Sequence, residues 1–103
     1  MQIFVYMLRC RDDSYYVGLT RYGLDKRFAE HQDGHYPGYT STRRPVKLVW
    51  AQEFQWLKDA IECERRLKGW RREKKEALSR GDYEALKILS RTARNPHPST
   101  SSG

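Results

Sequence analysis

Three short segments rich in apolar, aromatic and β-branched residues are typical of β-strands. They cover residues 3–10, 14–20 and 46–54, and the polar turn RDDS joins the first two. Asp and Ser favour such turns because their side chains hydrogen-bond the local backbone. We therefore expect a β-hairpin followed later by a third strand, in which Val46, Leu48 and Trp50 share one face.

The hairpin carries more tyrosine than a simple strand pair needs. If its turn centres on Asp12, Tyr6 lies opposite Gly18 and Leu8 lies opposite Tyr16 on one face of the hairpin. A glycine opposite a tyrosine leaves room for the ring to lie flat or for a ligand to approach the backbone. Tyrosine also simply favours strands, so this pattern alone leaves a structural explanation open.

Between the second and third strands, the spacing of residues predicts a helix. Leu24, Arg27, Phe28 and His31 fall at i, i+3, i+4 and i+7, and Gly34 is a stop signal. Arg27 at the edge of this stripe could pair with a carboxylate or present its planar guanidinium to a phosphate. His31 could equally be a hydrogen-bonded core residue.

The second half of the chain predicts three helices, and residues 35–45 predict a loop. The helices cover about residues 57–68, 72–80 and 82–91, with breaks at Gly69 and Gly81 and an N-cap at Asp82. The order β-β-α-β-α-α-α predicts an α+β fold, a small three-stranded antiparallel sheet flanked by helices. We expect one domain over residues 1–92 and a disordered tail over residues 93–103.

Glu64 is the carboxylate that fits its surroundings least well. On a helical wheel it lies in the middle of an apolar stripe, where a charge is costly unless it is paired or binds a metal. The stripe consists of Leu57, Ala60, Ile61 and Leu67. Pairing with a cation, such as Arg27, and coordination of a hard divalent cation through oxygen both explain this position.

The balance of charge favours a polyanionic partner. The 103 residues include 20 Lys and Arg against 13 Asp and Glu, which gives a net charge of +7. Basic residues interleaved with aromatic ones suit a groove that follows phosphates and stacks bases, although a solvated helix surface has the same composition. The candidate nucleic-acid contacts are Arg43, Arg44, Arg65, Lys68, Trp70, Arg71 and Arg72.

Other features exclude several classes of protein. The start of the chain lacks the pattern of a signal peptide, and no apolar run is long enough to span a membrane, so we expect a cytoplasmic protein without a membrane role. Cys10 and Cys63 lack the spacing of a zinc site or a disulfide framework and are expected to be reduced thiols. Nothing in the sequence indicates a protein partner.

Taken together, these motifs resemble the GIY-YIG nuclease superfamily, and most closely its small single-domain bacterial members of the URI type. The first motif is present as FVY at residues 4–6 and the second as YVG at residues 16–18. LDKRFAEH is similar to the helix that carries the family's arginine and histidine, and AIECERRLKGW to the segment with its metal-binding glutamate. The resemblance covers residues 2 to about 90.

The resemblance implies hydrolysis of phosphodiester bonds by water with one divalent ion, Mg²⁺ or Mn²⁺. By analogy, Glu64 would be the only protein ligand of the ion, and Tyr6 the general base. Arg27 would stabilise charge on the phosphate, Tyr16 would position water or phosphate, and His31 would orient Tyr6 or assist the leaving group. Gly18 would keep the site open.

The sequence departs from the family pattern at two points. Phe4 replaces the first motif's glycine, as is common in this subgroup, and the downstream asparagine of larger relatives has no convincing counterpart. The domain also lacks the separate DNA-binding domain of homing relatives, so single-stranded or branched DNA is expected rather than plain duplex. The alternatives are a non-catalytic nucleic-acid-binding module on the same fold and a protein-interaction domain. A role in DNA repair follows from family analogy alone.

Overall fold

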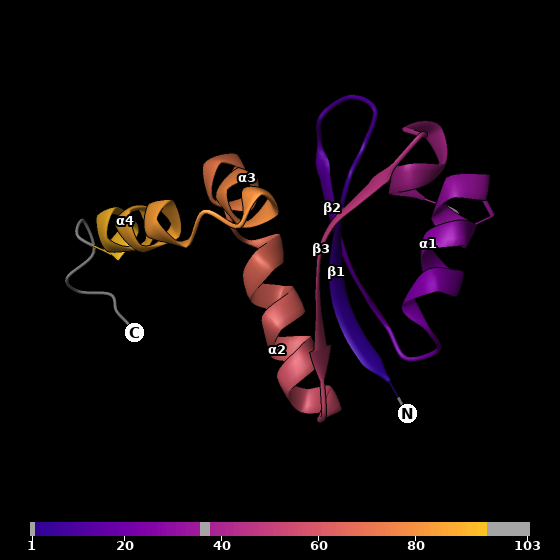
Figure 1. The fold of residues 1–103 in the computed structure, drawn as a ribbon, viewed down its shortest axis with the longest axis horizontal. Helices are drawn as coiled ribbons and strands as arrows, with labels where there is room; N and C mark the ends of the chain where they lie inside the picture. Colours follow the sequence, from indigo (N-terminus) through magenta and orange to yellow (C-terminus); the bar gives the residue numbers. More distant parts are fainter. Residues whose placement is uncertain (1, 36–37, 95–103) are drawn as a thin grey trace. The chain divides into compact units, whose positions relative to one another are not determined.

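The computed structural model describes residues 2–35 and 38–94, with side chains to residue 90. The expected element order is confirmed, with one additional 3₁₀ helix, η1, inside the predicted loop (Figure 1). The elements are β1 (Ile3–Arg9), β2 (Tyr15–Thr20), α1 (Leu24–Asp33), η1 (Tyr39–Thr42), β3 (Lys47–Phe54), α2 (Leu57–Lys68), α3 (Arg72–Arg80) and α4 (Tyr83–Arg94).

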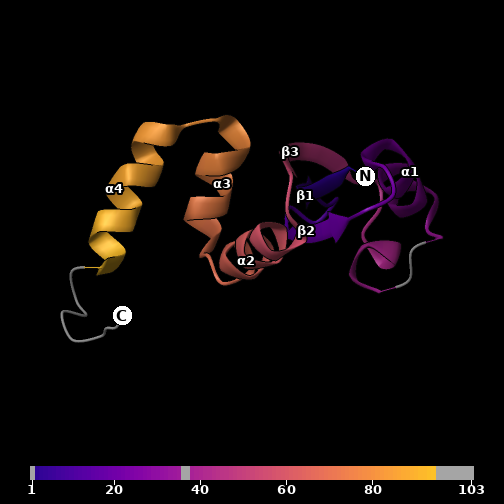
Figure 2. The same ribbon diagram turned by 90° about the horizontal axis from the view of Figure 1, so that it is seen from below.

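The three strands form one antiparallel sheet in the order β2-β1-β3. The sheet lies between α1 on one face and α2 on the other, as both ribbon views show (Figures 1 and 2). The expected hairpin register is confirmed, because Tyr6 is paired with Gly18 and Leu8 with Tyr16. The α+β class predicted from the sequence is therefore correct.

The two faces of the sheet bury different kinds of side chain. On the α1 face, Tyr6 and Leu8 are fully buried, and Leu24 and Phe28 of α1 pack against them. The opposite face carries the buried apolar residues of the alternate positions. They include Val5, Met7 and Val17, and this face is covered by α2, whose Ala60 and Leu67 are buried. Alternation along β1 thus puts the polar core on one side and the purely apolar core on the other.

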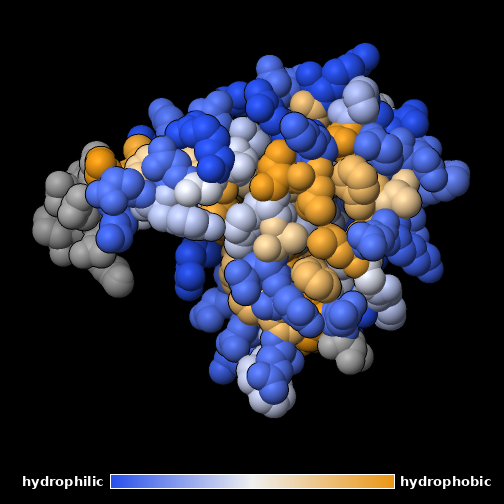
Figure 3. Space-filling model, in the orientation of Figure 1, coloured by the Kyte–Doolittle hydropathy of each residue, from blue (hydrophilic) through white to orange (hydrophobic). Residues whose placement is uncertain are grey.

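The prediction that Trp50 shares a face of β3 with Val46 and Leu48 is wrong. Leu48 is paired with Leu8, but Trp50 is paired with Met7, so one extra residue, Val49, is inserted between the two pairs. Successive residues of β1 face opposite sides of the sheet, so this bulge turns Trp50 to the face opposite Leu48. Apolar side chains gather over the β3 edge in Figure 3, where half-buried residues of this strand lie.

The chain divides into two compact units, and the prediction of one domain over residues 1–92 stays a prediction. The first ends at Trp70 and the second begins at Arg71 and contains α3 and α4. In the second unit, Gly81 ends α3 in the left-handed conformation (φ 70°), and Asp82 caps α4 by accepting a hydrogen bond from the Ala85 amide (3.1 Å).

The end of α4 also differs from the expectation. Helix α4 runs to Arg94, two residues into the expected tail, while residues 95–103 lie outside the described part of the chain. Within residues 2–35 and 38–94, none of the helices combines the length and the hydrophobicity that a membrane crossing requires.

Substitution of Gly18 tests the close contact within the hairpin. A Cβ at this position would lie 2.5 Å from the Tyr6 hydroxyl oxygen and 2.6 Å from Tyr6 Cζ, and both belong to a ring without room to move. We expect Gly18→Ala to lower the free energy of unfolding by about 1–3 kcal/mol, as overpacking does, in urea denaturation. Gly69→Ala is the matched control, because its Cβ would meet nothing closer than 3.6 Å. Equal stability of the two variants would contradict this packing.

Candidate active site

Tyr6 lies at the centre of the polar core on the α1 face. Its side chain is fully buried, and its ring lies against the backbone of Gly18, where no side chain intervenes. The hydroxyl oxygen is 2.9 Å from Nε2 of His31. The hairpin register and the glycine together therefore hold the phenol in one position, facing α1.

His31 joins two other elements to helix α1. Its side chain is fully buried, and while Nε2 meets Tyr6, Nδ1 lies 2.6 Å from the hydroxyl oxygen of Thr40 in η1. Thr40 is itself buried, with 1% of its surface exposed. Sequence reasoning missed Thr40, because a threonine in a loop rich in Ser, Thr and Gly carries no local signal of burial.

The surroundings of His31 keep its imidazole neutral. Burial, reinforced by the positive charge of Arg27, lowers the pKa of His31 from 6.5 to about 4, and Glu30 opposes this only in part. Near pH 7 the ring therefore donates one hydrogen bond and accepts another. An imidazole with so low a pKa is a poor proton acceptor.

Tyr16 connects the buried core with the surface through a series of rings. Its ring centroid lies 5.0 Å from that of His31 and 6.2 Å from that of Tyr39, which it stacks at an angle of 24°. The guanidinium of Arg43 lies over the ring of Tyr39, 3.8 Å from the ring centroid. Tyr16 is half-buried, so it has the access to solvent that Tyr6 lacks.

Arg43 and Arg44 make intramolecular contacts that hold the η1 segment in place. Arg43 donates from Nε to Asp12 (3.1 Å) and from Nη1 to the Tyr39 carbonyl (2.8 Å). Arg44 donates to the Ser41 carbonyl, and its guanidinium lies close to Gly34. The prediction that both contact nucleic acid stays a prediction, and the guanidinium groups already have a structural role.

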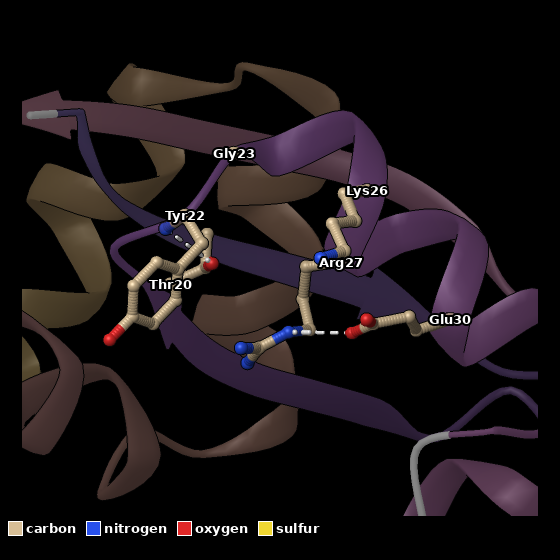
Figure 4. Close-up of a pocket in the computed structure, with 6 residues that line it drawn as sticks. All are labelled: Thr20, Tyr22, Gly23, Lys26, Arg27 and Glu30. Atoms are coloured by element: carbon tan, nitrogen blue, oxygen red, sulfur yellow. Dashed lines mark hydrogen bonds and ion pairs between the residues drawn. The ribbon is translucent and has the colours of Figure 1, made fainter.

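Arg27 lines a small pocket beside this core. The pocket has a volume of about 100 Å³, and its lining residues are Thr20, Tyr22, Gly23, Lys26, Arg27 and Glu30. Figure 4 shows the Arg27 guanidinium between the Tyr22 ring and the Glu30 carboxylate. Arg27 donates from Nε to Glu30 (3.2 Å) and contacts the Leu19 carbonyl (3.5 Å). The wall thus carries two cationic side chains, Lys26 and Arg27, and one carboxylate, Glu30, and this net positive charge suits an anionic group such as a phosphate.

Glu64 lies on a different face from this cluster. It occupies the predicted stripe of α2 between the buried residues Ala60 and Leu67, and 23% of its side chain is exposed. Its ion pair is with Lys68 (3.1 Å), whereas Arg27 pairs with Glu30, so the suggested Glu64–Arg27 pair is wrong. Since α2 covers the face opposite Tyr6, the structure brings together Tyr6, Tyr16, Gly18 and His31, but not Glu64, in one core.

The remaining basic candidates are spread over both units of the chain. Arg65 is exposed and lines a shallow groove on α2 with Leu57 and Ile61, and Trp70 is half-buried at the end of the first unit. Arg71 and Arg72 belong to the second unit, where Arg72 pairs with Glu76. Each unit thus carries part of this basic segment, and its contact with nucleic acid stays a prediction.

Comparison with known proteins identifies the family. Residues 2–77 match the family model of the GIY-YIG catalytic domain, which includes Tyr6, Tyr16, Arg27, His31 and Glu64. The chain belongs to the GIY-YIG family. The recognition from the two tripeptide motifs is confirmed.

The relatives of this GIY-YIG protein are small bacterial proteins of similar extent. It is 41% identical over 73 residues to the UPF0213 protein YazA of Bacillus subtilis, covering 71% of this chain and 73% of that one. A UPF0213 protein of Streptococcus pneumoniae is 42% identical over the same shares. The solution NMR structure of the UPF0213 protein BH0048 of Bacillus halodurans is similar, with a TM-score of 0.50 and 37% identity over 76% of this chain and 82% of that one.

The low pKa of His31 predicts a pH dependence of stability. In the unfolded chain the imidazole takes up a proton near pH 6.5, whereas in the folded protein it does so only near pH 4. The contribution of His31 to the free energy of unfolding is therefore fully present above pH 6.5. It falls by about 3 kcal/mol in total as the pH drops from 6.5 to 4.

Urea denaturation at steps from pH 7.5 to pH 4 measures this effect. The His31→Gln variant is the control, because it retains a polar side chain but has no group that titrates in this range. We expect the stability of the variant to fall less steeply over this range than that of the original chain. Parallel curves for the two proteins would show that His31 is not held neutral.

Proposed function

We propose that this GIY-YIG protein is a divalent-metal-dependent endonuclease that hydrolyses phosphodiester bonds in DNA. The observation that carries the proposal is the combination of the family match with the buried contact between Tyr6 and His31, beside the cationic pocket of Arg27. Single-stranded or branched DNA is the proposed substrate class, because the domain is small and rich in aromatic residues and because none of the helices in residues 2–35 and 38–94 is recognisable as a recognition helix.

The proposed roles follow from position and charge. The Tyr6 oxygen would accept a proton from the attacking water, since a phenol can act as a base where hydrogen bonds and positive charge favour the phenolate. Arg27 would bind the non-bridging oxygens of a phosphate and stabilise the charge that builds on them. Tyr16, with its partial exposure, would position the water or the phosphate. Because Tyr6 is fully buried, it can act as a base only if Tyr16 or the η1 segment shifts when DNA binds and lets water reach the Tyr6 oxygen.

The side chains present fit a metal held by few protein ligands. Within the described ranges, no three carboxylate, imidazole or thiol groups gather into a metal-binding cluster. Mg²⁺ is often bound by one or two carboxylates together with water and substrate phosphate, and the partly exposed Glu64 carboxylate can provide one such ligand. The bound ion would supply charge stabilisation at the leaving oxygen.

A non-catalytic nucleic-acid-binding module is the second candidate. Two observations favour it: the Tyr6 hydroxyl is enclosed, and the helix that carries Glu64 covers the opposite face of the sheet. Such a module would keep the salt-dependent attraction to phosphates without turnover. Catalysis in the presence of metal separates the two candidates.

Substitution of Glu64 tests the nuclease directly. End-labelled single-stranded, duplex and forked DNA would be incubated with the full chain in Mg²⁺, Mn²⁺ or chelator. We expect metal-dependent cutting, and Glu64→Gln to reduce it at least about a hundredfold, as loss of a metal ligand does.

The matched control for this experiment lies on the same helix. Glu62 of α2 is exposed. Glu62→Gln removes one carboxylate and changes the net charge as Glu64→Gln does, and it should leave the cutting rate unchanged. Circular dichroism would confirm that both variants fold. Binding without cutting on all substrates and with both metals would favour the binding module instead.

Substitution of Arg27 distinguishes charge stabilisation from simple anchoring. We expect Arg27→Ala to reduce kcat by about a hundredfold or more, because a donor to the charged transition state is lost, while DNA binding weakens only several-fold. Lys47→Ala, which removes an exposed positive charge on β3, is the control for net charge. Single-turnover kinetics and fluorescence anisotropy would measure the two effects. Weakened binding with unchanged kcat would make Arg27 a phosphate anchor alone.

A further inference from the structure

Tyr22 is the most exposed of the large apolar side chains in the part of the chain that the structure describes. It lies two residues beyond the end of β2, and 76% of its surface is accessible to solvent. A single exposed aromatic residue is ordinary on a protein surface. Tyr22 differs because it also lines the small pocket of Arg27, whose wall carries positive charge.

The main chain holds Tyr22 in place while its ring stays in solvent. The Tyr22 amide donates a hydrogen bond to Oγ1 of Thr20 (3.2 Å), and Thr20 is buried at the end of β2. Helix α1 begins two residues later, at Leu24. The ring therefore projects from a short connection that is fixed at both ends, so little chain entropy is lost when a ligand covers it.

The pocket beside the ring has the size and the charge for one phosphate group. Its volume of about 100 Å³ corresponds to about three water molecules in the liquid. Lys26 and Arg27 contribute two cations, and Glu30 orients the Arg27 guanidinium by accepting from Nε (3.2 Å). Figure 4 shows this guanidinium with the Tyr22 ring on one side and the Glu30 carboxylate on the other. An aromatic ring and a phosphate site are thus neighbours.

We propose that Tyr22 is a specificity-determining residue that stacks on a base of single-stranded DNA, while a phosphate next to that base lies against Lys26 and Arg27. Aromatic side chains stack on bases of any sequence, and adjacent cations neutralise the backbone. The inference rests on the proposed function, because it takes DNA as the ligand. It adds the residue that recognises the strand as unpaired.

A subsite of this kind discriminates against duplex DNA. Inside a duplex both faces of a base are covered by neighbouring bases, so a surface side chain reaches only phosphates and groove edges. In a single strand a base can leave the stack and lie against an aromatic ring. The cations of the pocket therefore attract both forms of DNA, whereas the Tyr22 ring contributes to the binding of only one.

Fluorescence anisotropy with labelled oligothymidylate, in chelator so that no cutting occurs, measures the contribution of the ring. We expect Tyr22→Ala and Tyr22→Leu to weaken binding about tenfold, as loss of one base stack does, and Tyr22→Trp to preserve it. Tyr83→Ala is the matched control, because Tyr83 is 62% exposed but belongs to the second unit. Unchanged affinity in Tyr22→Ala, or no binding of oligothymidylate by the original chain, would overturn the proposal.

Two further ligands separate stacking from charge. An abasic oligonucleotide has the phosphates without the bases, and a hairpin duplex has its bases paired, so Tyr22→Ala should bind both as the original chain does. Lys26→Ala should weaken binding of all three ligands and lower the slope of log Kd against log salt by about one. An equal loss of affinity for the abasic strand in Tyr22→Ala would refute stacking.

Cutting rates distinguish this subsite from the nuclease activity itself. With metal-dependent cutting established, we expect Tyr22→Ala to lower kcat/KM about tenfold on single-stranded DNA and to leave duplex cutting unchanged. Absence of any cutting, with binding that depends on Tyr22, would refute the nuclease and support the subsite. Cutting with the same preference in Tyr22→Ala and the original chain would support the nuclease and refute the subsite.

Discussion

The contact of Tyr6 with Gly18 and His31 is the constraint on which the α1 face of the sheet depends. Because position 18 carries no Cβ, the phenol ring lies directly on the neighbouring strand, and its hydroxyl reaches the helix above. His31 then fixes the orientation of α1 and, through Thr40, the position of η1. This buried series of hydrogen-bonded side chains thus connects a strand, a helix and a 3₁₀ helix that are distant in sequence.

A buried series of polar side chains has a desolvation cost that an apolar core avoids. Each hydroxyl and ring nitrogen must find a partner away from water, or its desolvation is not offset. Here the phenol, the imidazole and the threonine satisfy one another, and the burial of the imidazole keeps it uncharged. Leucine and phenylalanine could fill the same space without this desolvation cost.

The two faces of the sheet divide the family's characteristic residues between them. The tyrosines, the arginine and the histidine belong to the side of α1, where the Arg27 pocket also opens. The glutamate belongs to α2, where it is flanked by apolar residues and paired with a lysine. The two groups of family residues are thus carried by elements on opposite faces of the sheet.

Local sequence alone determined the three strands, the four α-helices, the hairpin register and the ends of α1, α2 and α3. The signals are local. They are the apolar runs of the strands, the RDDS turn, Gly34 and Gly81 at helix ends, and the cap at Asp82, and each acts over only a few residues. The motif residues Tyr6, Tyr16, Arg27, His31 and Glu64 were likewise predicted from spacing and resemblance.

Only the tertiary structure decided which of these residues meet. The bulge at Val49 turns Trp50 to the other face, Thr40 becomes the partner of His31, and Glu64 pairs with Lys68 and not with Arg27. The division of the chain after Trp70 was also not predicted. The physical reason is common to all four. Each depends on packing between segments far apart in the chain, and such packing leaves no periodicity or local turn signal in the sequence itself.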